Sequence, residues 1–248
     1  MDVVLPRKPI GVSASASSVP PALHSAELLL AQDFQELVAE VRQLQRRRVS
    51  MVSIRRQRAR RIGVDNLKMV LDDAGMQVCT LGFAGGFTGT LGRSYCQAVD
   101  DTRRALEFAA KLRARAVVVV PGSRGRHIYS HAERIVRDGI NDCLDDALRL
   151  RVDMLVPLTT VLGHRRDVFE PRCKSLLDWI GSYECHRVQA MMMLRRRAPL
   201  KGLPACWKRC LREGGALRIG HRCRATIGSH NVIAQILDGL SGVAVPVR

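Results

Sequence analysis

A glycine-rich stretch that follows a short apolar run is the part of this sequence with the clearest capacity to bind a ligand. Residues 82–92 contain five glycines, and Arg93 comes directly after them. Glycine lets the backbone approach a ligand closely or adopt a positive φ, and loops after buried strands are where α/β proteins usually bind ligands. A merely flexible connection is the alternative. The candidate ligand contacts are Gly85, Gly86, Phe87 and Arg93.

Two histidines follow the next apolar run. Residues 116–120 are Ala-Val-Val-Val-Val, and a strand that is apolar on both faces is typical of the middle of a parallel sheet. His127 and His131 lie just beyond this run and are four residues apart, so they share one face if the segment is helical. They are candidate substrate or metal contacts at the mouth of a pocket, and ordinary surface histidines are the alternative.

Length and composition predict a globular protein without a membrane anchor. The 248 residues are 46% hydrophobic, which is enough for a sizeable core. The apolar runs are shorter than the roughly 18 residues that span a bilayer, and residues 1–21 lack the apolar segment of a secretory signal. We therefore expect a cytoplasmic protein whose cysteines are mostly free thiols.

The formal charge of +17 favours a polyanionic partner such as nucleic acid. The arginines cluster at residues 46–48, 55–61 and 195–197, and the first two clusters contain no aromatic residue. Because the stacking platforms of single-strand binders are missing, a solvated basic surface is the preferred interpretation. Asp100 and Asp101 are likewise expected to be charges on a helix surface.

The spacing of apolar residues predicts alternating strands and helices with no adjacent hairpins, which demands a parallel sheet in a barrel or a doubly wound fold. The pattern weakens after residue 158, so about six strands are predicted where a full barrel needs eight. The expected strands are 10–13, 49–54, 77–81, 116–120, 153–158 and 188–194, with ambiguous segments at 219–227 and 232–237. The expected helices are 26–44, 64–74, 98–112, 133–150 and 175–180.

Several of these segments together resemble the sugar phosphate isomerase/epimerase family, the xylose-isomerase-like TIM barrels related to endonuclease IV and the ketose epimerases. The likeness rests on residues 63–78, 84–89, 98–101 and 117–120 and extends over about residues 10–181. It implies an α/β fold of the TIM (β/α)8 type, which we expect to be incomplete or degenerate in its C-terminal third. We expect a flexible segment at residues 1–9 and a single barrel domain at residues 10–248.

The resemblance also implies a divalent metal, Mn²⁺, Mg²⁺ or Zn²⁺, held by two Glu, one Asp and one His. Such an ion stabilises the enediolate formed by proton transfer next to a carbonyl, and the glutamates serve as acid and base. The positions that match these ligands carry Val156, Met193 and Gln235 instead. An alternative alignment has one strand and its helix missing, with residues 187–197 matching the strand that follows.

The resemblance implies a sugar or sugar-phosphate isomerase/epimerase-like protein, and the residues at the ligand positions predict that the metal is not retained and the chemistry is weakened or lost. The predicted ligand is a small sugar or sugar phosphate held by Gly85, Gly86, Phe87, Arg93, His127 and His131. A non-catalytic sugar-binding barrel and a nucleic-acid-binding barrel are the alternatives. Because an incomplete barrel leaves strand edges unpaired, a homodimer is a further expectation.

Overall fold

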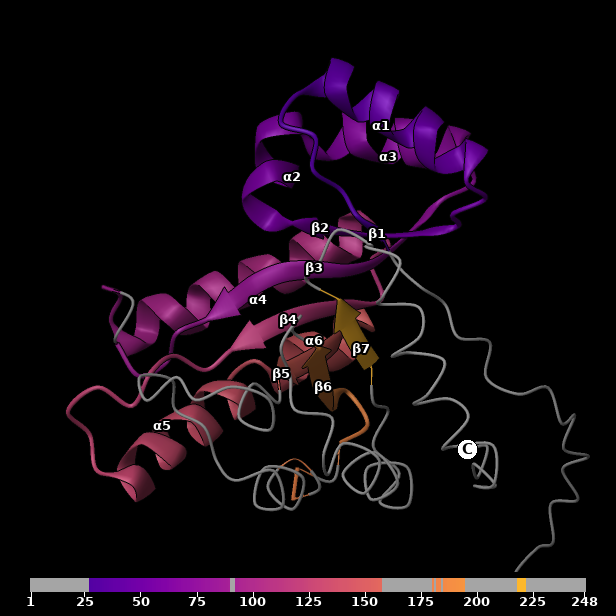
Figure 1. The fold of residues 1–248 in the computed structure, drawn as a ribbon. Helices are drawn as coiled ribbons and strands as arrows, with labels where there is room; N and C mark the ends of the chain where they lie inside the picture. Colours follow the sequence, from indigo (N-terminus) through magenta and orange to yellow (C-terminus); the bar gives the residue numbers. More distant parts are fainter. Residues whose placement is uncertain are drawn as a thin grey trace, which may run out of the picture.

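One parallel sheet organises the chain (Figure 1). The structure is a computed structural model that describes residues 27–89, 92–157, 180, 182–183, 185–194 and 218–221. Over these residues each strand pairs in parallel with the next strand in sequence. The strands are β1 (Glu27–Leu28), β2 (Met51–Arg55), β3 (Gln77–Gly85), β4 (Ala116–Val120), β5 (Asp153–Pro157), β6 (Val188–Leu194) and β7 (Arg218–His221).

This strand order is the one that successive βα units produce as a barrel forms. No pairing between β1 and β7 closes the sheet within the described ranges. The expected α/β class is therefore confirmed, and the sheet is not closed over the described residues. Homodimerisation through an open edge stays a prediction.

Helices cover one face of the sheet, which we call the helix face. The helices are α1 (Phe34–Arg46), α2 (Arg56–Ile62), α3 (Val64–Asp73), α4 (Tyr95–Lys111), α5 (Tyr129–Asn141) and α6 (Leu144–Leu150). Figure 1 shows α1, α2 and α3 grouped beside β1 and β2, with α4 lying along β3 and β4. Val117, Val119 and Val156 share a core with apolar residues of these helices.

The opposite face of the sheet, here called the inner face, carries its own small apolar cluster. Ala116, Val118, Leu155 and Met191 form it. Since neighbouring side chains on a strand point to opposite faces, the two clusters follow from the uninterrupted apolar runs of β4 and β5. The strands predicted at 116–120, 153–158 and 188–194 are confirmed with shifts of at most one residue.

The predicted helix at 26–44 is wrong at its beginning. Residues 27–28 form β1 and α1 begins only at Phe34, because Asp33 caps the helix by accepting a hydrogen bond from Glu36 N (2.8 Å). The Glu40 carboxylate also accepts hydrogen bonds from the backbone nitrogens of Leu30 (2.9 Å) and Ala31 (2.8 Å). These bonds hold the segment before α1 in a non-helical path.

Three further boundaries differ from the predictions. The segment 133–150 is two helices, α5 and α6, with a break after Asn141, where Asn and Asp favour turns over helix. Strand β3 continues to Gly85 instead of ending at residue 81. The short helix α2 was not predicted because its residues are mostly arginine, with only Ala59 and Ile62 on its buried apolar side.

The remaining predictions for secondary structure and domains fall largely outside the described residues. They concern the segment 1–9, the strand at 10–13, the helix at 175–180 apart from Ile180, and the segment 232–237. The segment 219–227 overlaps β7, which ends at His221. Among the described helices none is both long and apolar enough to cross a membrane.

Candidate ligand site at the carboxyl ends of β2 to β4

The carboxyl ends of β3 and β4 are held together through Gly85 and Gly86. Gly86 N donates a hydrogen bond to Val120 O (2.8 Å), and Gly85 N donates to Thr102 Oγ1 on α4 (3.1 Å). Gly85 has φ +99°, and a Cβ atom there would lie 2.3 Å from Val120 O. Glycine is required at this position because backbone approaches backbone. The start of the glycine-rich stretch is thus a fixed junction and not a merely flexible connection.

A buried carboxylate with two arginine partners lies beside this junction. Asp101 Oδ2 accepts hydrogen bonds from Arg56 Nη2 (2.5 Å) and Arg93 Nη1 (2.6 Å). Arg56 Nη1 also donates to the backbone oxygen of Asp101 (2.8 Å). The side chains of Arg56 and Asp101 are 8% and 9% exposed, whereas that of Arg93 is 44% exposed.

The local sequence explains how these groups meet. Arg56 directly follows β2, and Arg93 lies in the loop between β3 and α4. The next residue, Ser94, caps α4: its Oγ accepts from Gln97 N (3.2 Å) and its own N donates to Gln97 Oε1 (2.9 Å). The cap sets the start of α4, and Asp101 lies on the side of the helix that its buried apolar residues turn to the core.

Electrostatics at this cluster favour the ionised carboxylate. Burial by itself would raise the pKa of Asp101, but the hydrogen bond and charge of Arg56, and then the charges of Arg93 and Arg60, hold the pKa below its usual value. Burial also lowers the pKa of Arg56, although a guanidinium stays protonated in proteins. Several cations therefore surround one anion at the carboxyl ends of β2 and β3.

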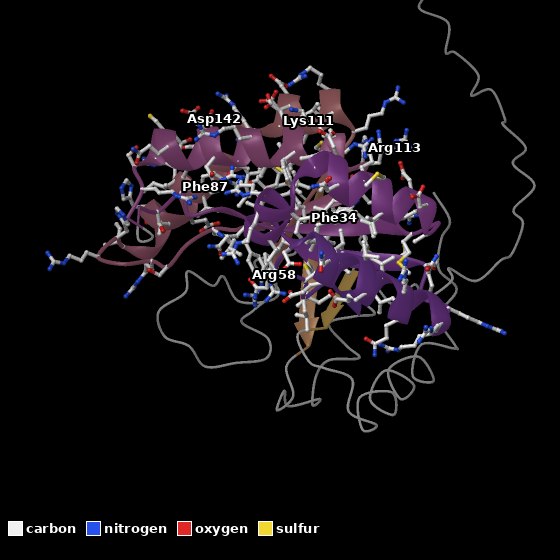
Figure 2. The ribbon with its side chains drawn as sticks, turned by 90° about the horizontal axis from the view of Figure 1, so that it is seen from above. Phe34, Arg58, Phe87, Lys111, Arg113 and Asp142 are labelled. Atoms are coloured by element: carbon white, nitrogen blue, oxygen red, sulfur yellow. The ribbon has the colours of Figure 1, made fainter. Side chains whose placement is uncertain are left out.

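The two phenylalanines of the glycine-rich region differ in exposure: Phe87, the predicted ligand contact, is buried, whereas Phe83 is exposed. Phe87 is 1% exposed and lies in the interior (Figure 2), where a Cβ on Gly139 of α5 would be 2.4 Å from its ring. Phe83, in contrast, is a large exposed side chain on β3. Its neighbour Ala84 belongs to the core on the helix face, and Phe83 is the extra residue of a bulge, because Gly82 pairs with Val118 and Ala84 with Val119.

The two predicted histidines lie together, and His127 links two loops. His127 Nε2 hydrogen-bonds to the backbone oxygen of Thr88 (3.2 Å), so the loop after β4 contacts the loop after β3. The rings of His127 and His131 are 5.1 Å apart between centroids. Arg134 Nη2 lies 2.9 Å from His131 Nδ1, which places a guanidinium on one nitrogen of that ring.

The positions predicted to have lost metal ligands are apolar or lie outside the described side chains. Val156 is buried in the core on the helix face, and its neighbour Leu155 belongs to the apolar cluster on the inner face. The backbone of Met193 pairs in register with Gly220 of β7, and Gln235 is outside the described residues. That these positions have lost ligands stays a prediction.

The residues present at this end of the described sheet do not fit a divalent cation. Hard cations require several oxygen ligands, and within the part of the chain that the structure describes no three His, Cys, Asp or Glu side chains come together. The acidic group nearest the ends of β2 and β3, Asp101, is already bound by two guanidinium groups. This set of charges suits an anion.

Sequence reasoning named Arg93 as a candidate contact, which stays a prediction, and it did not single out three other side chains at this edge of the sheet. Arg56 was grouped with a surface cluster, and Asp101 was predicted to be exposed; Asp100 is exposed as predicted, whereas its neighbour is buried. Phe83 was passed over in favour of Phe87. The alternation of apolar residues on α4 could have shown that Asp101 shares the buried side with Ala98, Ala105 and other core residues.

A parallel sheet of successive βα units whose strands lie in sequence order is the arrangement typical of TIM-barrel proteins. The model of the xylose isomerase-like TIM barrel family matches residues 36–159, half of the chain, and this protein belongs to that family. The expected family is therefore confirmed. A comparison with curated proteins gave no match.

Solved structures of several sugar epimerases share the fold. The 3-keto-D-glucoside 4-epimerase of E. coli is 12% identical, with a TM-score of 0.62 over 86% of this chain and 98% of its own. The D-allulose 3-epimerase of Methylomonas sp. is 13% identical, with a TM-score of 0.63 over 84% and 74%. An AP endonuclease of family 2 from Brucella melitensis is 12% identical, with a TM-score of 0.62 over 87% and 88%.

Proposed function

We propose that this chain is an isomerase/epimerase-like barrel that binds a small sugar or sugar phosphate and in which metal-dependent proton transfer is weakened or lost. Membership of the xylose isomerase-like family supports a sugar ligand, since solved structures with this fold include epimerases of 3-keto-D-glucosides and D-allulose. Ligands of parallel α/β folds bind at the carboxyl ends of the strands, which here are the ends of β2 to β4.

The observation that carries the proposal is the chemistry of this edge. An exposed aromatic ring, Phe83, lies on β3 two residues before the carboxyl end of the strand, and an apolar ring provides a flat surface for the C–H face of a sugar. The arginines Arg56 and Arg93 lie at the ends of β2 and β3, and β5 presents Leu155 instead of a carboxylate. Side chains suited to binding a sugar or a phosphate lie at this edge of the sheet. The carboxylates needed for metal-assisted proton transfer are missing from the carboxyl ends of the described strands.

Metal titration tests the catalytic half of the proposal. We expect calorimetry of the full chain with MnCl2 to show no stoichiometric site of about micromolar affinity or tighter. Incubation with D-fructose and MnCl2, analysed by chromatography for epimers, should give no product above an enzyme-free control. A stoichiometric manganese site, or turnover that EDTA abolishes, would contradict the loss of metal chemistry.

A matched pair of phenylalanine variants tests the binding half. Phe83 and Phe34 are 42% and 39% exposed, but Phe34 lies at the beginning of α1 and not on β3 (Figure 2). Phe83→Ala should weaken binding of D-fructose or D-fructose 6-phosphate by about tenfold, the scale of a lost aromatic contact. Phe34→Ala should leave it unchanged. Equal effects of both substitutions, or no measurable binding by the unmodified chain, would refute the proposed site.

A further inference from the structure

We propose that the cluster of Arg56, Arg60 and Arg93 around Asp101 is a binding site for the phosphate group of a sugar phosphate. This inference deepens the proposed function and rests on it for the sugar part of the ligand. It assigns the anionic class of the ligand and the residues that recognise it. Its basis is a local excess of positive charge at the carboxyl ends of β2 and β3.

The charges in this cluster are unbalanced. Two guanidinium groups share the single oxygen Oδ2 of Asp101, and Arg60 acts on the same carboxylate through its charge. In other ion pairs of the described structure three arginines, Arg103, Arg149 and Arg187, meet three acids, Asp100, Asp146 and Asp153. Like charges held close together repel each other, so a bound anion would lower the electrostatic energy of the folded state.

The cluster also has hydrogen-bond donors available for an anion. Arg93 contacts Asp101 through Nη1, and its side chain is 44% exposed, which leaves other N–H groups of its guanidinium facing solvent. Arg60 is exposed one helical turn after Arg56, so both lie on the same side of α2. Planar guanidinium groups match the oxygen geometry of phosphate.

The position of the cluster fits one part of a sugar phosphate. Thr102, the residue after Asp101, accepts the hydrogen bond from Gly85 N that fixes the end of β3. Phe83 lies two residues before Gly85 on the same strand, and Arg93 is in the loop that follows. Phe83 and Arg93 therefore belong to one strand and the loop after it, while Arg56 and Arg60 come from α2 and Asp101 from α4.

This surface is less suited to binding an extended polyanion such as nucleic acid. Arg58 Nη1 donates to Leu29 O (3.2 Å) and Arg61 Nη1 donates to Gln32 Oε1 (2.6 Å). Both side chains are thus directed toward the segment before α1, while Arg56 is buried. The basic run at 55–61 does not present one continuous cationic face, and a single phosphate group suits it better than a nucleic-acid backbone.

Two arginine variants of the full chain test the site. Arg93→Gln removes one charge from the cluster and leaves Asp101 paired with Arg56, so the variant should fold. Arg61→Gln removes one charge from the neighbouring surface and is the matched control. Affinities for D-fructose 6-phosphate, D-fructose and inorganic phosphate are measured by calorimetry, with circular dichroism to confirm folding. A 20-residue single-stranded oligonucleotide, titrated at several salt concentrations, is the nucleic-acid arm.

We expect D-fructose 6-phosphate to bind at least about tenfold more tightly than D-fructose, with inorganic phosphate as a competitor, because a charge-assisted hydrogen bond is worth about this factor or more. Arg93→Gln should remove this advantage, and Arg61→Gln should change it by less than about twofold, as expected for an exposed charge.

Three results would overturn the phosphate site. Equal affinity for the two sugars would refute it and leave the proposed function standing. Equal losses in Arg93→Gln and Arg61→Gln would show only a general effect of charge. Oligonucleotide binding that depends on Arg93, competes with D-fructose 6-phosphate and falls steeply with salt would assign the arginines to nucleic acid. Conversely, phosphate binding through Arg93 without binding of either sugar would support the anion site and refute the sugar-binding function.

Discussion

Removing the carboxylate of Asp101 is the sharpest test of how the carboxyl edge of the sheet is built. In Asp101→Ala the buried guanidinium of Arg56 loses the hydrogen bond from Nη2 but keeps the one from Nη1 to the backbone oxygen of residue 101. Arg93 is half-exposed and regains water. The cost therefore comes from Arg56, whose charge is left buried and without its counter-ion.

The magnitude follows from this geometry. Removing one partner of a buried ion pair costs about 3 to 5 kcal/mol, and the retained backbone hydrogen bond of Arg56 places the expected loss near the lower end, about 3 kcal/mol. Asp100→Ala is the matched control because Asp100 is 62% exposed and 3.9 Å from its partner Arg103. A pair of this kind contributes about 0.5 kcal/mol or less.

Urea unfolding followed by circular dichroism measures both variants. With a slope of about 3 kcal/mol per molar urea, Asp101→Ala should lower the midpoint by about 1 M, and Asp100→Ala by less than about 0.2 M. If the two variants differed in unfolding free energy by less than about 1 kcal/mol, Asp101 would not act as the buried counter-ion that the structure indicates.

The same variant predicts a dependence on pH. The pKa of Asp101 in the folded chain lies below its usual value of 3.8, so ionised Asp101 contributes stability above that pH. This contribution is lost as the pH falls through the lower pKa of the folded state. The stability difference between the unmodified chain and Asp101→Ala should therefore be constant near neutral pH and shrink below about pH 4. A difference that grew on acidification would contradict this sign.

Two further predictions concern backbone packing and thiol reactivity. In urea unfolding, Gly85→Ala should destabilise the chain by several kcal/mol more than Gly75→Ala. Both glycines have positive φ, but only at Gly85 would a Cβ atom meet a backbone oxygen, at 2.3 Å. Equal losses of stability in the two variants would contradict the close approach of β3 and β4. Burial raises the pKa of Cys143 to about 12. Peptide mapping after treatment with iodoacetamide at pH 8 should therefore find Cys143 unmodified and the exposed Cys96 alkylated. Rapid alkylation of Cys143 in the folded chain would contradict its burial.

Much of the fold could be predicted from local sequence because it depends on residue type and spacing. The β-branched run at 116–120 is the strand β4 with the predicted bounds, since such residues favour a buried, pleated conformation. The helix at 98–112 is confirmed with a start three residues earlier, at Tyr95. The alternation of these elements was sufficient to indicate a parallel α/β fold, and the resemblance to the TIM-barrel family followed from the same segments.

The site could be predicted only in part, because burial is decided by what packs on a residue. Asp100 and Asp101 are adjacent and of the same type, yet only Asp101 lies on the side of α4 that turns to the sheet and meets Arg56. Arg56 itself is 45 positions away in sequence, and no local pattern links the two.

The glycine-rich stretch shows the same division between sequence and structure. Its composition alone indicated a place where the backbone needs unusual freedom, and Gly85 confirms this with its contact to Val120. Which of its two phenylalanines would be exposed was decided by a distant residue: Gly139 of α5 leaves the space that Phe87 fills, while Phe83 stays exposed. Spacing along a chain determines which elements form, but exposure depends on the packing of elements that are far apart in sequence.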